Sequence, residues 1–140
     1  MQTNELIFSV MNGLTPRPQG SKNVGRRKNG SHYVYEPKQA ELKAWRAAVA
    51  DAAVEAIMRQ DWIMAETPVT VSAVFYFPAP KSDPHRVFAH TAPDTDKLLR
   101  AIGDAMTEAG VYKDDKLVVG YDHVRKLCGA PGVDITVTKA

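Results

Sequence analysis

Cysteine is almost absent from the sequence, because Cys128 is the only one among 140 residues. A single thiol excludes a disulfide within the chain. It also excludes a zinc site built from cysteine, because such a cage needs several thiolates. A reducing compartment suits a chain of this kind, so we expect a cytoplasmic protein.

Long hydrophobic runs are also missing. No stretch approaches the roughly 18 apolar residues that a membrane-spanning helix needs. The first ten residues, MQTNELIFSV, lack the basic start and apolar stretch of a signal peptide. Hydrophobic residues make up 44% of the chain and charged residues 24%, as in ordinary globular proteins. We therefore expect a folded chain with one domain over residues 1–140.

The formal net charge is small, at +2, and by itself indicates no partner. The distribution of charge is more informative. The acidic side chains are dense between residues 94 and 122, where we count seven. A second stretch is basic and holds no acidic residue, and its members are Arg17, Lys22, Arg26, Arg27 and Lys28. The basic stretch predicts contacts with phosphates, and the acidic stretch predicts a site for a cation.

Hydrophobic periodicity predicts two helices separated by strands. Apolar residues recur at helical spacing from Pro37 to about Arg59, and again from Asp94 to Gly110. Short apolar or alternating runs predict strands at 5–11, 31–37, 68–77, about 117–126 and 132–138. This order predicts an α+β domain in which one mixed or antiparallel sheet is covered by two helices.

Two segments without a hydrophobic period are predicted to be loops. Residues 12–30 are rich in glycine, proline, asparagine and basic side chains, and residues 78–93 are rich in proline. A loop as long as 78–93 is usually functional or mobile. For the basic loop, a solvated segment and a DNA-binding segment are both open interpretations.

The segment PDTD at residues 93–96 carries the most informative carboxylates. Asp94 and Asp96 project to the same side if the backbone between them is extended. Capping of a helix is, however, the commoner role of an aspartate in this position. Another acidic pair, Asp114 and Asp115, precedes the next strand, where turn formation is the ordinary role. Spacing alone therefore leaves a metal site the less frequent interpretation.

The two acidic pairs would meet if the strand after Asp115 lies beside the second helix. Carboxylates that converge on one point cannot all stay ionised without a cation. Their hard oxygen ligands suit Mg²⁺, with Mn²⁺ as the alternative. Such a metal site performs phosphodiester hydrolysis well, because the metal activates water and shields charge on the phosphate.

Two basic residues accompany these carboxylates. Arg100 follows Asp96 by one helical turn on the polar face of the predicted helix. It can pair with Asp96 or reach the scissile phosphate, and an ordinary exposed ion pair is the alternative role. Lys97 lies nearby in the sequence.

The run PDTDKLLRAIGDAMTEAGVYKDDKLVV, residues 93–119, resembles the RusA family of Holliday-junction resolvases. Members of that family show a Pro-Asp-Leu-Asp-Asn opening, a helix with a basic residue, and an Asp-Asp pair before a strand. The N-terminal part is also similar, with a first strand, a proline-containing basic loop in GLTPRPQGSK and a Trp-bearing helix in YEPKQAELKAW. The resemblance covers nearly the whole chain in order.

The resemblance implies a small homodimeric endonuclease that cuts four-way DNA junctions in recombination and repair, using Mg²⁺ held by carboxylates. It assigns the metal and catalysis to Asp94, Asp96 and Asp115. The family's helix lysine is Arg100 here, which keeps the charge but not the compact ammonium. The asparagine usual after the second aspartate is Lys97, so Lys97 is a second candidate for the active-site cation.

Two other functions are compatible with the sequence. One is a catalytically inactive, structure-selective DNA-binding protein, which the residues at 97 and 100 favour and the retained aspartates disfavour. The other is a metal-dependent nuclease that acts on forks, flaps or RNA structures. In each case the basic stretch would contact phosphates without reading sequence. Side chains of the long loop would add contacts or stack on unpaired bases, namely His85, Arg86, Phe88 and His90.

Overall fold

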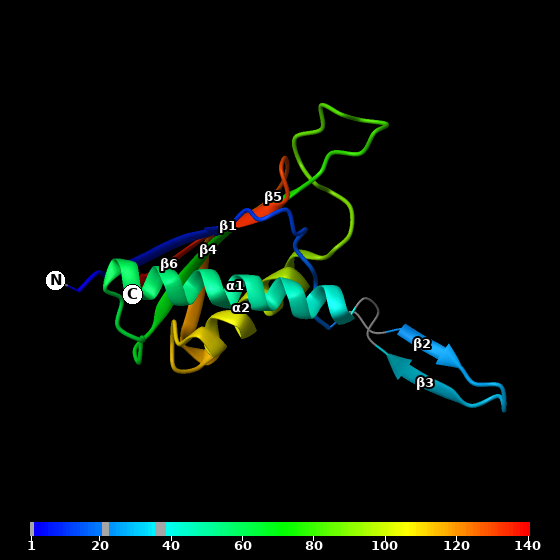
Figure 1. Cartoon of the computed structure of the whole chain (residues 1–140), viewed down its shortest axis with the longest axis horizontal. Helices are drawn as coiled ribbons and strands as arrows, with labels where there is room; N and C mark the ends of the chain where they lie inside the picture. The colour runs from blue at the N-terminus through cyan, green and yellow to red at the C-terminus, as the bar shows by residue number, and fades with distance from the viewer. Residues whose placement is uncertain (1, 21–22, 36–38) are drawn as a thin grey trace.

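The computed structural model describes the whole chain except residues 1, 21–22 and 36–38. A four-stranded sheet in the order β1-β6-β4-β5 forms its centre, and helices α1 and α2 pack against it (Figure 1). The helices are α1 (Gln39–Gln60) and α2 (Thr95–Ala109). The strands of this sheet are β1 (Glu5–Val10), β4 (Val69–Phe77), β5 (Val118–Cys128) and β6 (Gly132–Lys139).

The sheet is mixed, as an α+β domain with two covering helices predicts. β6 pairs antiparallel with both β1 and β4, whereas β5 runs parallel to β4. The last two strands are consecutive in the chain, yet β4 lies between them. The connecting segment CGAPG therefore passes the end of β4, where the Gly129 N–H donates to the Phe77 carbonyl at 2.9 Å.

The core lies between the helices and one face of the sheet. Alternation along the strands sends every second side chain into this core, as in β4, where four such residues are at most 1% exposed. α1 contributes Trp45, which is fully buried, together with Val49 and Ala53. α2 contributes its predicted apolar stripe, which includes Leu98, Ile102 and Met106. This packing fixes the position of α2 against the sheet.

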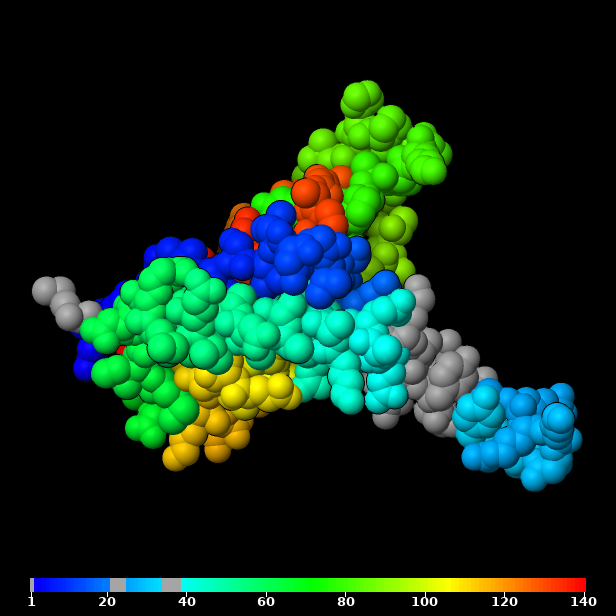
Figure 2. All heavy atoms as spheres, in the orientation of Figure 1, coloured from blue at the N-terminus to red at the C-terminus, as the bar shows by residue number. Residues whose placement is uncertain are grey.

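Residues 23–35 form a second, two-stranded sheet. β2 (Asn23–Arg26) pairs antiparallel with β3 (His32–Tyr35), and the hairpin stands away from the body of the protein (Figures 1 and 2). The prediction of a loop throughout residues 12–30 is therefore wrong for β2. Its flanks are too polar to show an apolar alternation, and the turn signal of Asn29 and Gly30 closes a hairpin, with Gly30 at φ +90°.

The other predicted elements are observed with small shifts. α1 occupies the predicted range, although Pro37 lies outside the described residues. α2 begins after Asp94 and ends at Gly110, whose left-handed conformation (φ 82°) closes it. β5 continues to Cys128, two residues beyond the predicted end. In the described part of the chain, neither helix has the length and apolar character required to cross a membrane.

Candidate active site

Asp94 and Asp96 lie at the N-terminal end of α2. Asp94 is the N-cap residue, with an extended backbone (φ −69°, ψ 141°), and its side chain makes no capping hydrogen bond. The commonest role of an aspartate in this position is therefore not the one observed. Asp96 lies in the first turn, and both residues are exposed. The two carboxylates are thus accessible to a ligand at the positive end of the helix dipole.

The cationic side chains Lys97 and Arg100 flank these carboxylates. Lys97 Nζ lies 3.8 Å from Asp94 Oδ2, a weak and exposed ion pair. Arg100 lies against Gly20, where a Cβ atom would come within 2.6 Å of its Nη1. The neighbouring Gln19 N–H donates to the Lys97 carbonyl at 3.0 Å. The segment up to Gly20 therefore packs on the first turns of α2, beside both cations.

The second acidic pair has two different roles. Asp114 caps the short 3-10 helix η1 (Asp115–Leu117), because its Oδ1 accepts from the Lys116 backbone N–H at 2.9 Å. Turn formation is thus the role of Asp114. Asp115 is exposed and lies at a hollow of about 280 Å³ beside the C-terminal half of α2. The hollow is lined by Arg46, Asp104, Thr107, Glu108, Asp114 and Asp115.

The carboxyl groups of Asp114 and Asp115 influence each other in this hollow. A hydrogen bond between the two side chains raises the pKa of Asp115, as do burial, the charge of Asp114 and the charge of Asp104. The Lys116 backbone N–H lowers the pKa of Asp114, with a further contribution from the Asp115 side chain. Asp104 follows Asp96 by eight residues on the polar face of α2, where the sequence predicted at most an ordinary ion pair with Arg100 and no place in the site. A cation bound here would relieve the repulsion.

The structure does not bring Asp94, Asp96 and Asp115 of one chain to a single point. α2 has 15 residues and is about 22 Å long. Asp94 and Asp96 lie at its start, whereas Asp115 lies with Asp104 beside its C-terminal half. Within the described residues, no group of three or more His, Cys, Asp or Glu side chains is placed to hold a metal ion. The oxygen donors suit Mg²⁺ chemically, but one chain alone does not assemble them into a cage.

The candidate DNA-binding residues are distributed over two regions. Arg26, Arg27 and Lys28 lie on the projecting hairpin, and all are exposed. The Arg27 guanidinium lies 5.1 Å from the centroid of the Tyr33 ring, an arrangement that orients it on the hairpin. Arg17 lies on the body, half-buried, with Nη2 3.9 Å from Glu41 Oε1. Lys22 lies outside the described residues.

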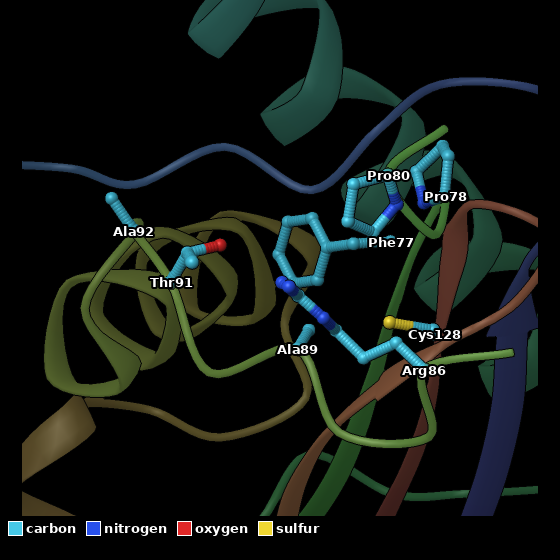
Figure 3. A pocket seen from close by; sticks show the side chains of 8 residues that line it. All are labelled: Phe77, Pro78, Pro80, Arg86, Ala89, Thr91, Ala92 and Cys128. Atoms are coloured by element: carbon cyan, nitrogen blue, oxygen red, sulfur yellow. The ribbon is translucent and has the colours of Figure 1, made fainter. Parts of the chain in front are cut away.

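The long loop of residues 78–93 leads directly into Asp94. It encloses a hollow of about 240 Å³ at the ends of β4 and β5 (Figure 3). Phe88 and His90 in this loop are exposed, whereas Arg86 is half-buried and donates from Nε to Asp83 Oδ2 at 3.1 Å. The hollow is lined by Phe77, Pro78, Pro80, Arg86, Ala89, Thr91, Ala92 and Cys128.

Comparison with known proteins identifies one family. A family model described as endodeoxyribonuclease RusA matches residues 14–138 of the 140-residue chain. The matched segment contains the start of α2 and the pair Asp114–Asp115. No curated protein matches the chain significantly.

Asp114→Asn is expected to lower the pKa of Asp115. The substitution removes the carboxylate that both accepts the hydrogen bond of protonated Asp115 and repels its ionised form. A pH titration followed by carbon-detected NMR of the side-chain carboxyls would measure the shift. Asp122→Asn, which removes an aspartate from β5, serves as the control. An Asp115 pKa that is the same in the Asp114→Asn variant as in the control would contradict the proposed coupling.

Proposed function

Since the chain belongs to the RusA family of endodeoxyribonucleases, we propose that it cuts four-way (Holliday) DNA junctions in a reaction that depends on Mg²⁺. The family match confirms the resemblance indicated by the motifs. The observation that carries the proposal is the exposed carboxylate pair at the start of α2, where Asp94 occupies the N-cap position without capping. A carboxylate that the helix does not use is available for chemistry.

We propose that Asp94, Asp96 and Asp115 hold the metal, with Mn²⁺ as a possible substitute. Bound Mg²⁺ would activate a water molecule and neutralise charge on the scissile phosphate. Arg100 and Lys97 are the candidates for contacting that phosphate, because both lie within the first two turns of α2 beside the carboxylates. The guanidinium of Arg100 is suited to a bidentate contact with phosphate oxygens.

We propose that the protein acts as a homodimer. A four-way junction offers two symmetric strands, and a twofold dimer supplies two sites in the same relation. The position of the carboxylates gives a second argument. Because Asp94 and Asp115 lie toward opposite ends of α2, an antiparallel arrangement of two α2 helices would place the start of one helix beside the end of the other. A dimer of that kind would bring together carboxylate ligands that lie far apart within one chain.

The separation of the carboxylates also favours one competing function, a DNA-binding protein that does not cleave. Incubation of the protein with a four-way junction, a fork and a linear duplex, each with and without Mg²⁺, separates the alternatives. Cleavage confined to the junction and to Mg²⁺ supports the proposed function. Binding without cleavage would indicate the inactive protein, and cleavage of the fork alone would indicate a different nuclease.

Single substitutions Asp94→Asn, Asp96→Asn and Asp115→Asn are expected to abolish cleavage and to spare junction binding. The amide keeps the size of the side chain but removes the charge that the cation requires. The loss should exceed the roughly 10–100-fold effects typical of residues that only support metal ligands. Single-turnover cleavage and gel-shift titrations measure the two effects.

Asp114→Asn is the matched control for this series, and its effect on cleavage should be milder because Asp114 caps η1. Full cleavage by Asp115→Asn together with none by Asp114→Asn would show that the other member of the pair is the ligand. Full cleavage by both Asp94→Asn and Asp96→Asn would exclude the proposed metal site.

Neutralising the hairpin is expected to weaken DNA binding more than it slows chemistry. The variant carries Arg26→Ala, Arg27→Ala and Lys28→Ala. Each lost phosphate contact reduces the slope of log affinity against log salt concentration by about 0.9, so three contacts would reduce it by up to about 2.7. Lys43→Ala with Arg59→Ala, on the body, should leave the slope nearly unchanged. An unaltered slope in the hairpin variant would mean that the hairpin is solvated and does not contact DNA.

Sedimentation is expected to show a dimer at micromolar concentration. Sedimentation velocity of the wild-type protein, at the concentration used for cleavage, makes the measurement. A mixture of inactive Asp94→Asn and Asp115→Asn chains should recover part of the activity, since one mixed site would contain a full set of intact ligands. If the protein sediments as a monomer at a concentration at which it still cleaves junctions at the full rate, the proposed dimer is overturned.

A further inference from the structure

We infer that Lys126 is a positioning residue that holds the turn from which Asp94 and Asp96 project. Lys126 lies in β5, and its Nζ donates to the carbonyl of Thr91 at 2.7 Å and to that of Pro93 at 2.6 Å. Pro93 is followed directly by Asp94. The inference rests on the proposed function, in which the carboxylates at the start of α2 carry the chemistry.

The backbone of β5 holds the preceding part of the same loop. The Ala89 N–H donates to the Lys126 carbonyl at 2.9 Å, and the Cys128 N–H donates to the Val87 carbonyl at 2.8 Å. These two bonds bring residues 87–89 alongside the end of β5, antiparallel to it. The Lys126 side chain continues this attachment to residues 91 and 93. β5 therefore guides the chain up to the residue before Asp94.

An ammonium group is well suited to this role. It carries three N–H donors and no acceptor, so one side chain can satisfy two carbonyls of a turn that has no strand partner. Hydrogen bonds from a charged donor are shorter and stronger than neutral ones, as the two distances at Lys126 indicate. Lys126 is half-buried, which limits the competition of water for these carbonyls.

The turn is partly exposed to solvent. Thr91 and Ala92 are exposed, and both line the hollow that opens beside the loop, with Cys128 of β5 on its opposite side (Figure 3). Lys126 itself is anchored firmly, because its neighbour Leu127 pairs with Tyr76 of β4 and Lys126 pairs with the fully buried Phe75. The lysine thus connects a strand in the sheet to a turn that is partly exposed.

The role of Lys126 differs from that of the apolar face of α2. Leu98 and Ile102 fix the helix against the core. Asp94 precedes the first helical residue, so its direction depends on residues 91–93. Loss of the two lysine bonds should therefore leave the fold intact and change the direction of the Asp94 carboxylate.

Lys126→Met tests the inference, because methionine keeps an unbranched apolar side chain but has no donor and no charge. We expect single-turnover cleavage of a junction to slow by about 10–100-fold, the range seen when residues that orient metal ligands are removed. Junction affinity should change by no more than twofold. Hydrogen exchange should accelerate in peptides covering residues 87–97 and stay unchanged in α1 and β4. Lys126→Arg, which retains donors, should recover part of both effects.

Arg125→Met is the matched control. It removes one positive charge from the adjacent position of β5, where the exposed Arg125 donates from Nη1 to the Val124 carbonyl at 2.9 Å. It should alter neither the cleavage rate nor exchange in residues 87–97. Equal rates and equal exchange in the Lys126→Met and Arg125→Met variants would overturn the inference. Exchange that accelerates throughout the chain would overturn it as well, by assigning Lys126 a general structural role.

Two further outcomes are distinguishable. Should Lys126→Met fail to fold, Lys126→Leu provides the same comparison, because leucine also has no donor and no charge, and unchanged exchange in residues 87–97 of that variant would overturn the inference. Should the wild-type protein cleave no branched DNA with Mg²⁺, the proposed function fails. The hydrogen-exchange comparison does not depend on cleavage. Unchanged protection of residues 87–97 in the Lys126→Met variant would therefore overturn the positioning role of Lys126 independently.

Discussion

The parallel pairing of β5 with β4 is the constraint on which the candidate site depends. Two parallel neighbours require a crossover, and the loop of residues 78–93 followed by α2 supplies it. α2 must therefore start near the ends of both strands and return toward the start of β5. Asp94 and Asp96 then lie near Lys126, late in β5, while Asp115 lies just before β5 begins. The distance between the carboxylates is thus a consequence of topology.

Local signals in the sequence were sufficient to predict the helix that carries Asp94 and Asp96. The apolar stripe of α2, with Asp94 before it and Gly110 after it, predicted both ends of that helix, because caps and periodicity act within one turn. The order of the strands was not predictable in this way. Nothing in the sequence around CGAPG indicates that β4 lies between β5 and β6, since strand order is decided by packing of distant segments. The convergence of carboxylates depends on that order, and spacing could not establish it.

Two aspartates in equivalent positions show how the fold separates structural from chemical roles. Asp94 and Asp114 each occupy the N-cap of a helical segment with an extended backbone, yet only the side chain of Asp114 accepts a hydrogen bond from a backbone N–H. Both positions would be interpreted as caps from the sequence. The start of α2 is instead held by buried Leu98 and by the bonds that Lys126 and Gln19 make around it. The Asp94 carboxylate therefore takes no part in capping the helix.

The proposed function gives different roles to the exposed carboxylates and to the basic residues of the β2–β3 hairpin. Exposed carboxylates at α2 and at Asp115 repel a phosphate, so they cannot supply the affinity for DNA in the absence of a cation. Three basic residues, Arg26, Arg27 and Lys28, lie on the β2–β3 hairpin, which stands away from the body (Figure 2). Screening at physiological salt confines each charge to about 8 Å, so the cation that acts on the Asp94 carboxylate is the adjacent Lys97. Under the proposed function, the hairpin would attract DNA and the carboxylates would bind the metal ion.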